Sequence, residues 1–244
     1  MKRYSTLVIL LVFIFSISCT TQQVTQTISD VLNPGLSTQE VASGLKEALT
    51  KGISEGAEAA SRVDGFLGNP NIRIPLPPEI QKIESRLRQV GMGSEVDRFI
   101  TTLNRGAEQA AAEAKPIFIS AIRSMTIQDA WDILRGENNA ATQYLRRTTS
   151  DQLTEKFSPV IQKSLEQVNA TRYYGDLVST YNRIPGVQKI NEDLNAYATE
   201  RALDGLFFLV AQEEANIREN PAARTTDLLR RVFGEQQEPR EGLN

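Results

Sequence analysis

The chain has 244 residues, 40% of them hydrophobic, and its 27 basic and 30 acidic residues give a formal net charge of −3. This length and composition suffice for a buried core, whereas the acidic balance, without a basic stretch, argues against nucleic-acid binding through phosphate neutralisation. The chain has no histidine and one cysteine. Histidine-based catalysis, an intrachain disulfide and a thiolate zinc cluster are therefore excluded, and we expect neither a metal nor a cofactor.

Residues 1–18 have the pattern of a signal peptide. Lys2 and Arg3 precede an apolar run, Leu7–Ile17, that is too short to span a bilayer. The run ends at Cys19 in the sequence SISC, which resembles a bacterial lipobox, although serine stands where leucine is usual three residues before the cysteine. We expect Cys19 to be acylated and to anchor the chain to a membrane. The alternative is an ordinary signal peptide with an incidental cysteine.

The residues after Cys19 bear on location and on domain boundaries. Thr20 follows the cysteine where an aspartate would signal retention, which by resemblance to bacterial sorting rules favours the outer membrane and a domain facing the periplasm. The polar Thr/Gln-rich stretch that follows predicts a flexible tether. The expected divisions are a signal peptide at 1–18, a tether at 19–35, an all-helical domain at 36–234 and a polar tail at 235–244.

The folded part is expected to begin with a helix. Ser37 and Glu40 have the spacing of a capping box, and the apolar residues after them recur every three or four positions, as on one helix face. Gly52 and Gly56 lie on that same face. They either permit a second helix to approach closely or weaken the helix, and we favour close packing.

The segment from Asp64 to Pro78 is the main non-helical insertion. Glycines and the Asn69-Pro70 pair punctuate it, and its prolines exclude a central strand. Because the segment also carries apolar side chains that need cover, we expect an ordered loop that lies over the helices.

Helical periodicity and capping signals divide the rest of the chain into helices. Pro78, Ser94, Thr126 and Ser150 mark the expected starts of four of them, and Pro159 is expected inside one. The expected helices are 78–90, 94–114, 117–125 after a break or kink at Lys115-Pro116, 127–134, 140–149, 150–168, 171–182, 196–217, and one from Thr225 or Thr226 to Gly234.

The segment Ala196–Ile217 contains the densest apolar run of the mature chain, from Leu203 to Ala211. It is flanked by charge and is too short to cross a bilayer. We therefore expect a central helix that other helices cover, in a fold that is all-α: a single compact multi-helix domain.

Asp204 is a candidate site residue because it lies inside this apolar run, and a buried carboxylate needs a partner. It is expected to form a structural ion pair or to be partly exposed, and the functional alternative is the polar floor of a cleft. The adjacent Glu213 and Glu214 point about 100° apart on a helix and cannot form a facing acid/base pair. The candidate partners of Asp204 are Arg201, three residues earlier, and Arg73, Arg123, Arg147 and Arg224.

A second candidate cluster combines a hydroxyl, a phenol and two guanidinium groups on the predicted helix 140–149. Thr142, Tyr144, Arg146 and Arg147 would suit the recognition of an anionic group. The alternative is a surface helix whose tyrosine is half buried.

Five stretches together resemble a known family. They are DGFLGNPNIRIPLP (64–77), AKPIF (114–118), AATQYLRR (140–147), ALDGLF (202–207) and NPAARTTDLL (220–229). On these the chain is similar, from about Leu36 to Gly234, to the bacterial family catalogued as domain of unknown function 4197. The resemblance implies an exported, helical, often lipid-anchored protein of Gram-negative bacteria, and it implies no particular activity.

Three functions remain open from the sequence. We favour a non-enzymatic, lipid-anchored module that faces the periplasm and binds an envelope protein or another envelope component. The second is a carrier of a small apolar or anionic ligand in a helical cleft, with Asp204 or Arg147 at its mouth. The third is a carboxylate-based hydrolase of envelope glycans, which would need two carboxyl groups about 5 to 9.5 Å apart across a cleft.

Overall fold

The computed structural model describes residues 37–167, 169–183, 185–186, 193–220 and 230. Several expected features lie outside these residues: the signal peptide, the tether with Cys19, Arg224, the last helix and the polar tail. Contacts within the chain separate Met1–Glu40 from Val41–Asn244, and the packing described below is that of the second unit.

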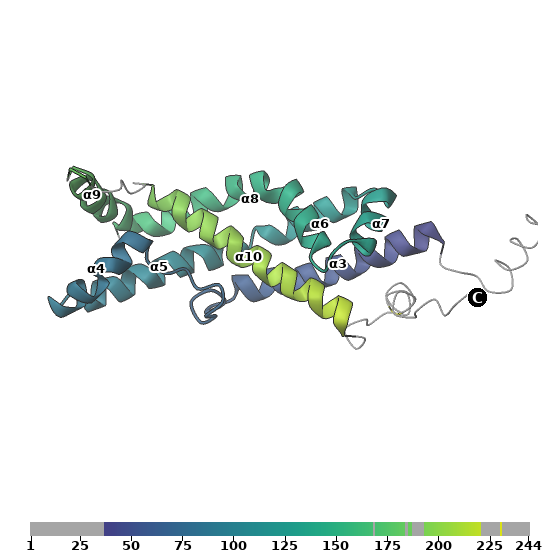
Figure 1. Cartoon of the computed structure of the whole chain (residues 1–244), viewed down its shortest axis with the longest axis horizontal. Helices are drawn as coiled ribbons and strands as arrows, with labels where there is room; N and C mark the ends of the chain where they lie inside the picture. Colours follow the sequence, from purple (N-terminus) through teal and green to yellow (C-terminus); the bar gives the residue numbers. More distant parts are fainter. Residues whose placement is uncertain (1–36, 168, 184, 187–192, 221–229, 231–244) are drawn as a thin grey trace, which may run out of the picture. The chain divides into compact units, whose positions relative to one another are not determined.

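The secondary structure of the described residues is helical, as the sequence predicts. The helices are α3 (Thr38–Ser61), α4 (Pro78–Gln89), α5 (Gly93–Ala111), α6 (Ala114–Ser124), α7 (Ile127–Arg135), α8 (Ala140–Gln167), α9 (Ala170–Asn182) and α10 (Leu194–Glu219) (Figure 1). None of these described helices combines the length and the apolar content needed to cross a membrane.

Most predicted helix starts are confirmed, each by its own local chemistry. The Ser37 hydroxyl accepts the Glu40 N–H at 3.2 Å, and the Glu40 carboxylate accepts the Ser37 N–H at 2.8 Å. Pro78 is the first residue of α4, and Thr126 forms a capping box with Asp129 at the start of α7. The predicted cap at Ser94 is wrong: α5 begins one residue earlier, without a side-chain cap.

The predicted break at Ser150 is also wrong, because α8 runs without interruption from Ala140 to Gln167. The hydroxyl groups of Thr148, Thr149 and Ser150 each donate to the carbonyl four residues earlier, at 2.9, 2.7 and 2.6 Å. These residue types favour helix caps, but here their side chains bond to the preceding turn of the same helix. A run of capping residues therefore lies inside a long helix.

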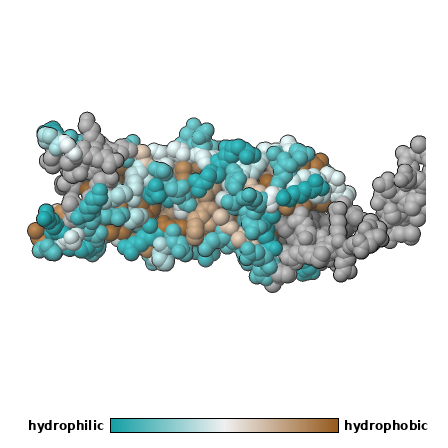
Figure 2. Space-filling view, viewed as in Figure 1, coloured by the Kyte–Doolittle hydropathy of each residue, from teal (hydrophilic) through white to brown (hydrophobic). Residues whose placement is uncertain are grey.

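Helix α10 is a core helix, as predicted for the segment Ala196–Ile217. It packs against α5, α8 and α9 and crosses α8 and α5 obliquely in Figure 1. Phe207 is buried and meets the Phe118 ring edge-to-face, with the centroids 5.7 Å apart. Helix α8 is equally central, since it contacts α5, α6, α7, α9 and α10. On the face along which α10 runs, Figure 2 shows apolar surface between hydrophilic areas.

The glycines of α3 permit close packing, as predicted. A Cβ atom built on Gly52 would lie 2.8 Å from Cδ1 of Ile217, and one on Gly56 would lie 3.6 Å from the backbone of Leu209. Both neighbours belong to α10, so α3 approaches α10 at a distance that a larger residue at Gly52 would not allow.

Candidate functional site

The segment from Asp64 to Pro77 is an ordered loop, as predicted, and two polar residues of α5 fix it. Glu108 is only 3% exposed, and its Oε1 accepts the N–H groups of Phe66 and Leu67, both at 3.1 Å. Asn104 accepts the Ile74 N–H at 2.8 Å and donates to the Ile74 carbonyl at 2.9 Å. Loop backbone groups that burial would otherwise leave unpaired are therefore satisfied by buried side chains.

Helix α10 fixes the other side of the loop. A Cβ atom on Gly205 would lie 2.6 Å from the Phe66 ring and 3.0 Å from Cβ of Ile72, so the loop packs where α10 lacks a side chain. The Tyr197 hydroxyl donates to the carbonyl of Pro75 at 3.2 Å. The loop is thus held between α5 and α10.

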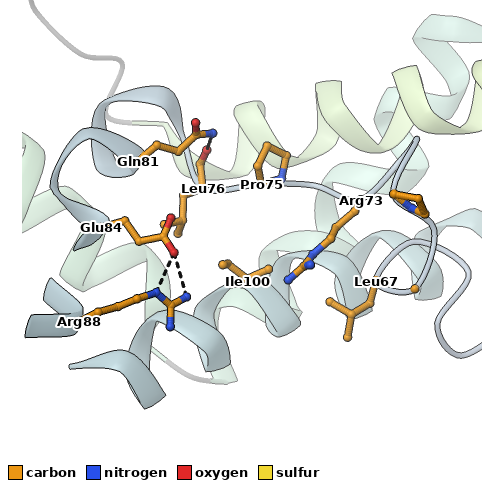
Figure 3. Close-up of a pocket in the computed structure, with 10 residues that line it drawn as sticks. Leu67, Arg73, Pro75, Leu76, Gln81, Glu84, Arg88 and Ile100 are labelled. Carbon is orange, nitrogen blue, oxygen red and sulfur yellow. Dashed lines mark hydrogen bonds and ion pairs between the residues drawn. The ribbon is translucent and has the colours of Figure 1, made fainter. Parts of the chain in front are cut away.

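Two open grooves flank the fixed loop. The α4–α5 groove has a volume of about 900 Å³ and includes Leu67, Glu84, Arg88 and Ile100 (Figure 3). The α10 groove has a volume of about 450 Å³ and includes Asn71, Tyr197, Arg201, Asp204 and Phe208. Arg73, Pro75 and Gln81 line both grooves, so the loop supplies a wall that the two share.

Arg73 is a cation that the described residues leave without a hydrogen bond or an ion pair. Its side chain extends from the loop toward Ile100 of α5 in Figure 3. By contrast, Arg88 bonds both Glu84 and Asp97 at 2.8 Å. The pKa of Asp97 is lowered, chiefly by the hydrogen bond from Arg88 and to a smaller extent by the charge of Arg73. Arg73 therefore remains available to an anionic group that enters either groove.

Asp204 lies in the wall of the α10 groove, and it is partly exposed and ion-paired, which is the plainer of the two expectations from the sequence. Its side chain is 44% exposed, with Arg146 at 3.1 Å and Arg201 at 3.7 Å. Of the described partners considered from the sequence, Arg201 bonds it and Arg73 lines the same groove. Arg146 comes from the other cluster. The helix turns Asp204 outward, while its neighbours Leu203 and Gly205 are buried. Asp204 is a half-exposed ion-paired residue.

The residues of the second predicted cluster point to different places. The hydroxyl of Thr142 donates to Glu214 at 2.8 Å. Tyr144 is buried, which raises the pKa of its phenol, and the guanidinium of Arg147 lies 5.6 Å from its ring centroid. Neither Tyr144 nor Arg147 lines the α10 groove with Arg73 and Asp204. The sequence-predicted residues therefore fall into two separate groups.

Glu214 has a buried structural role that the sequence reasoning missed. Its side chain is 4% exposed, and its carboxylate accepts the N–H groups of Ala141 and Thr142 at 2.9 and 2.8 Å. Arg218, one turn later, bonds the same carboxylate at 2.9 Å. Glu214 thus caps the N-terminus of α8 from another helix, where a negative charge is favourable. A glutamate and an arginine four residues apart next to an apolar run were the available signal.

A comparison of the sequence with known families gives a match that covers all the described residues. The family described as "Protein of unknown function (DUF4197)" matches residues 35–234. The chain belongs to this family. No curated protein and no solved structure matches it. The described residues of this DUF4197 domain all lie within the matched range, so the fixed loop and both grooves are features of the family region.

The α10 groove of the DUF4197 domain combines exposed aromatic surface with positive charge. Phe208 is 40% exposed although it lies in the middle of the most apolar helix segment. The guanidinium of Arg201 lies 5.9 Å from the ring of Tyr197, and that of Arg146 lies 4.5 Å from the buried ring of Phe207. This surface can take up an apolar side chain beside an anionic one.

Each of the two grooves has one carboxylate among the described residues that line it. Glu84 lines the α4–α5 groove and is bonded to Arg88, and Asp204 lines the α10 groove and is bonded to Arg146. The small gap inside the core, between α3, α8 and α10, has a volume of about 10 Å³, which is no more than one water molecule occupies. That gap offers no room for an apolar ligand.

Proposed function

We propose that this DUF4197 chain is a non-enzymatic binding module of the Gram-negative envelope that is anchored through Cys19 and faces the periplasm. Export is supported by Lys2 and Arg3 ahead of the apolar run Leu7–Ile17. Lipidation is supported by a sole cysteine placed at the end of that run. Acyl chains on Cys19 would hold the domain at the membrane, with the outer membrane favoured by Thr20.

We infer that the α10 groove binds a segment of an envelope protein, and the exposure of Phe208 carries this inference. Aromatic and arginine side chains are enriched at the centres of protein interfaces, and Tyr197 and Arg201 lie in the same groove. Arg73 would form a charge-assisted hydrogen bond with a carboxylate of the partner. Because the loop is already fixed by Glu108 and Asn104, little ordering would oppose binding.

A photo-crosslinking residue at position 208 of the full chain, expressed in its own host, tests this proposal. The matched control is position 127, because Ile127 is another large exposed apolar residue and lies on α7. We expect a discrete adduct with one envelope protein at position 208, its loss in the Arg73→Glu variant, and no such adduct at position 127. Equal adducts at both positions, or an adduct unaffected by Arg73→Glu, would contradict the proposal.

The anchor is tested separately by the Cys19→Ala variant. We expect the unaltered chain to incorporate an alkyne-labelled fatty acid and to sediment with membranes, and the variant to lose both properties. Labelling that persists in Cys19→Ala would show that Cys19 does not carry the acyl group.

A carrier of a small anionic ligand is the second candidate, and the same Arg73 favours it. Native mass spectrometry of protein from its host would detect such a ligand as added mass that Arg73→Glu removes. The hydrolase alternative has less support, because the carboxylate that lines each groove beside the loop, Glu84 or Asp204, is paired with an arginine.

A further inference from the structure

A third pocket lies between α8 and the N-terminal part of α10, apart from the two grooves beside the loop. Its volume is about 290 Å³, and we call it the polar pocket because six of its eight lining residues carry a side-chain oxygen atom. The oxygen-bearing residues that line it are Thr154, Ser158, Asp193, Asn195, Thr199 and Glu200, and Ala196 and Leu203 add apolar surface. No lysine or arginine is among the described residues that line it.

Two oxygen atoms of the polar pocket have no hydrogen-bond partner among the described residues. Thr199 is only 4% exposed, and its Oγ1 is buried without a partner. The Oδ1 atom of Asn195 is also buried and unpaired, while its Nδ2 donates to the Ser158 hydroxyl at 2.7 Å. Buried polar atoms are almost always paired in folded proteins. Both residues line the same pocket, so a molecule bound there is placed next to the two unpaired oxygen atoms.

The charge of the pocket selects the kind of donor. Asp193 and Glu200 place two carboxylates at it. The positive end of α10 does not reverse this charge, because Asp193 accepts the Ala196 N–H at 2.8 Å and so caps the helix. Arg201 is 3.7 Å from Glu200, but it does not line the pocket. The surroundings therefore favour a cation that donates hydrogen bonds over an anion.

We propose that the polar pocket binds the ammonium group of a small primary amine. An alkylammonium group carries a positive charge and three N–H donors, which matches two unpaired oxygen atoms and a carboxylate. Ala196 and Leu203 supply apolar contact for the methylene groups that such an amine carries. This inference does not depend on the binding of an envelope protein in the α10 groove.

Titration of the full chain with putrescine, followed by calorimetry, tests the proposal, with 1,4-butanediol as an uncharged probe of similar length. We expect putrescine to bind and butanediol not to bind. The Thr199→Val variant keeps the side-chain shape but removes the hydroxyl, and we expect it to weaken putrescine binding about tenfold. The Glu200→Gln variant, at an exposed position that tolerates substitution, should weaken binding about threefold through the lost charge.

The Thr149→Val variant is the matched control. Thr149 is a buried threonine of α8 whose hydroxyl donates to the Leu145 carbonyl at 2.7 Å, and it does not line the pocket. Putrescine binding should be unchanged in this variant. The proposal is overturned by an absence of putrescine binding, by equal binding of butanediol, by binding unaffected in both Thr199→Val and Glu200→Gln, or by calcium chloride binding in place of the amine.

Discussion

The two ends of α10 both bury polar side chains, but only one end satisfies them. Toward the C-terminal end, Glu214 accepts hydrogen bonds from two backbone N–H groups of α8 and forms an ion pair with Arg218. Toward the N-terminal end, the oxygen atoms of Thr199 and Asn195 have no partner among the described residues. An unpaired buried polar group costs about 1–3 kcal/mol. The first end therefore stabilises the fold, whereas the second gives up stability in a place where a ligand could restore it.

The largest effect on stability should come from removing the carboxylate of Glu214 at the satisfied end. We expect Glu214→Ala to lower the free energy of unfolding by about 3–5 kcal/mol, because it removes the buried carboxylate that Arg218 bonds and leaves the N–H groups of Ala141 and Thr142 without that acceptor. Urea denaturation followed by circular dichroism measures this loss. A cost below about 1 kcal/mol would mean that water replaces the carboxylate, and the two ends of α10 would then not differ as described.

The role of Glu214 could not be read from the sequence, although the helix that carries it could. Apolar spacing locates α10 because a helix buries a face of its own. The bond from Glu214 to Thr142 joins residues 72 positions apart, and periodicity within one segment carries no information about such pairs. For the same reason, Asn104 and Glu108 were missed as the residues that fix the loop, although the loop itself was predicted to be ordered.

The missed partner of Asp204, Arg146, and the wrong break at Ser150 have a local cause. Both residues were judged from the character of the sequence around them: Asp204 from its apolar neighbours and Ser150 from its capping preference. In the structure, Asp204 falls on the outward side of α10, and the Ser150 hydroxyl bonds to the Arg146 carbonyl inside α8. The rotation of a helix and the choice between a cap and an internal bond are decided by tertiary packing, which outweighs such preferences.

A substitution midway along α10 separates packing from polar pairing. We expect Gly205→Ala to lower the free energy of unfolding by about 1–3 kcal/mol, because the added methyl group meets Phe66 and Ile72 of the loop. The control is Gly175→Ala in α9, where nothing lies within 4 Å of the added atom and the helix should gain up to about 1 kcal/mol. Thermal melting compares the two, and a gain at both positions would show that the loop is not held tightly against α10.

Removing a buried polar group at the unsatisfied end should raise stability, whereas removing one at the satisfied end should lower it. We expect Thr199→Val to raise the free energy of unfolding of the ligand-free chain by about 1 kcal/mol, because it removes an unpaired buried hydroxyl at constant shape. Thr149→Val should lower it by a similar amount, since that hydroxyl is bonded. Urea denaturation of dialysed protein measures both. Destabilisation of equal size in the two variants would show that the Thr199 hydroxyl has a partner after all.

The smallest effect on stability should come from replacing Glu213, the neighbour of Glu214, and this replacement should also raise stability. Burial raises the pKa of Glu213 above its ordinary value of 4.5, and the charge of Glu55 raises it further. A carboxyl group whose pKa is raised by folding favours the folded state below its unfolded pKa, and this contribution is lost as the pH rises through the folded pKa. Glutamine resembles the protonated form, so Glu213→Gln should leave stability unchanged near pH 4 and raise it by less than about 1 kcal/mol at pH 7. Denaturation at the two pH values checks this, and a loss at pH 7 like that of Glu214→Ala would mean that the two glutamates have the same role.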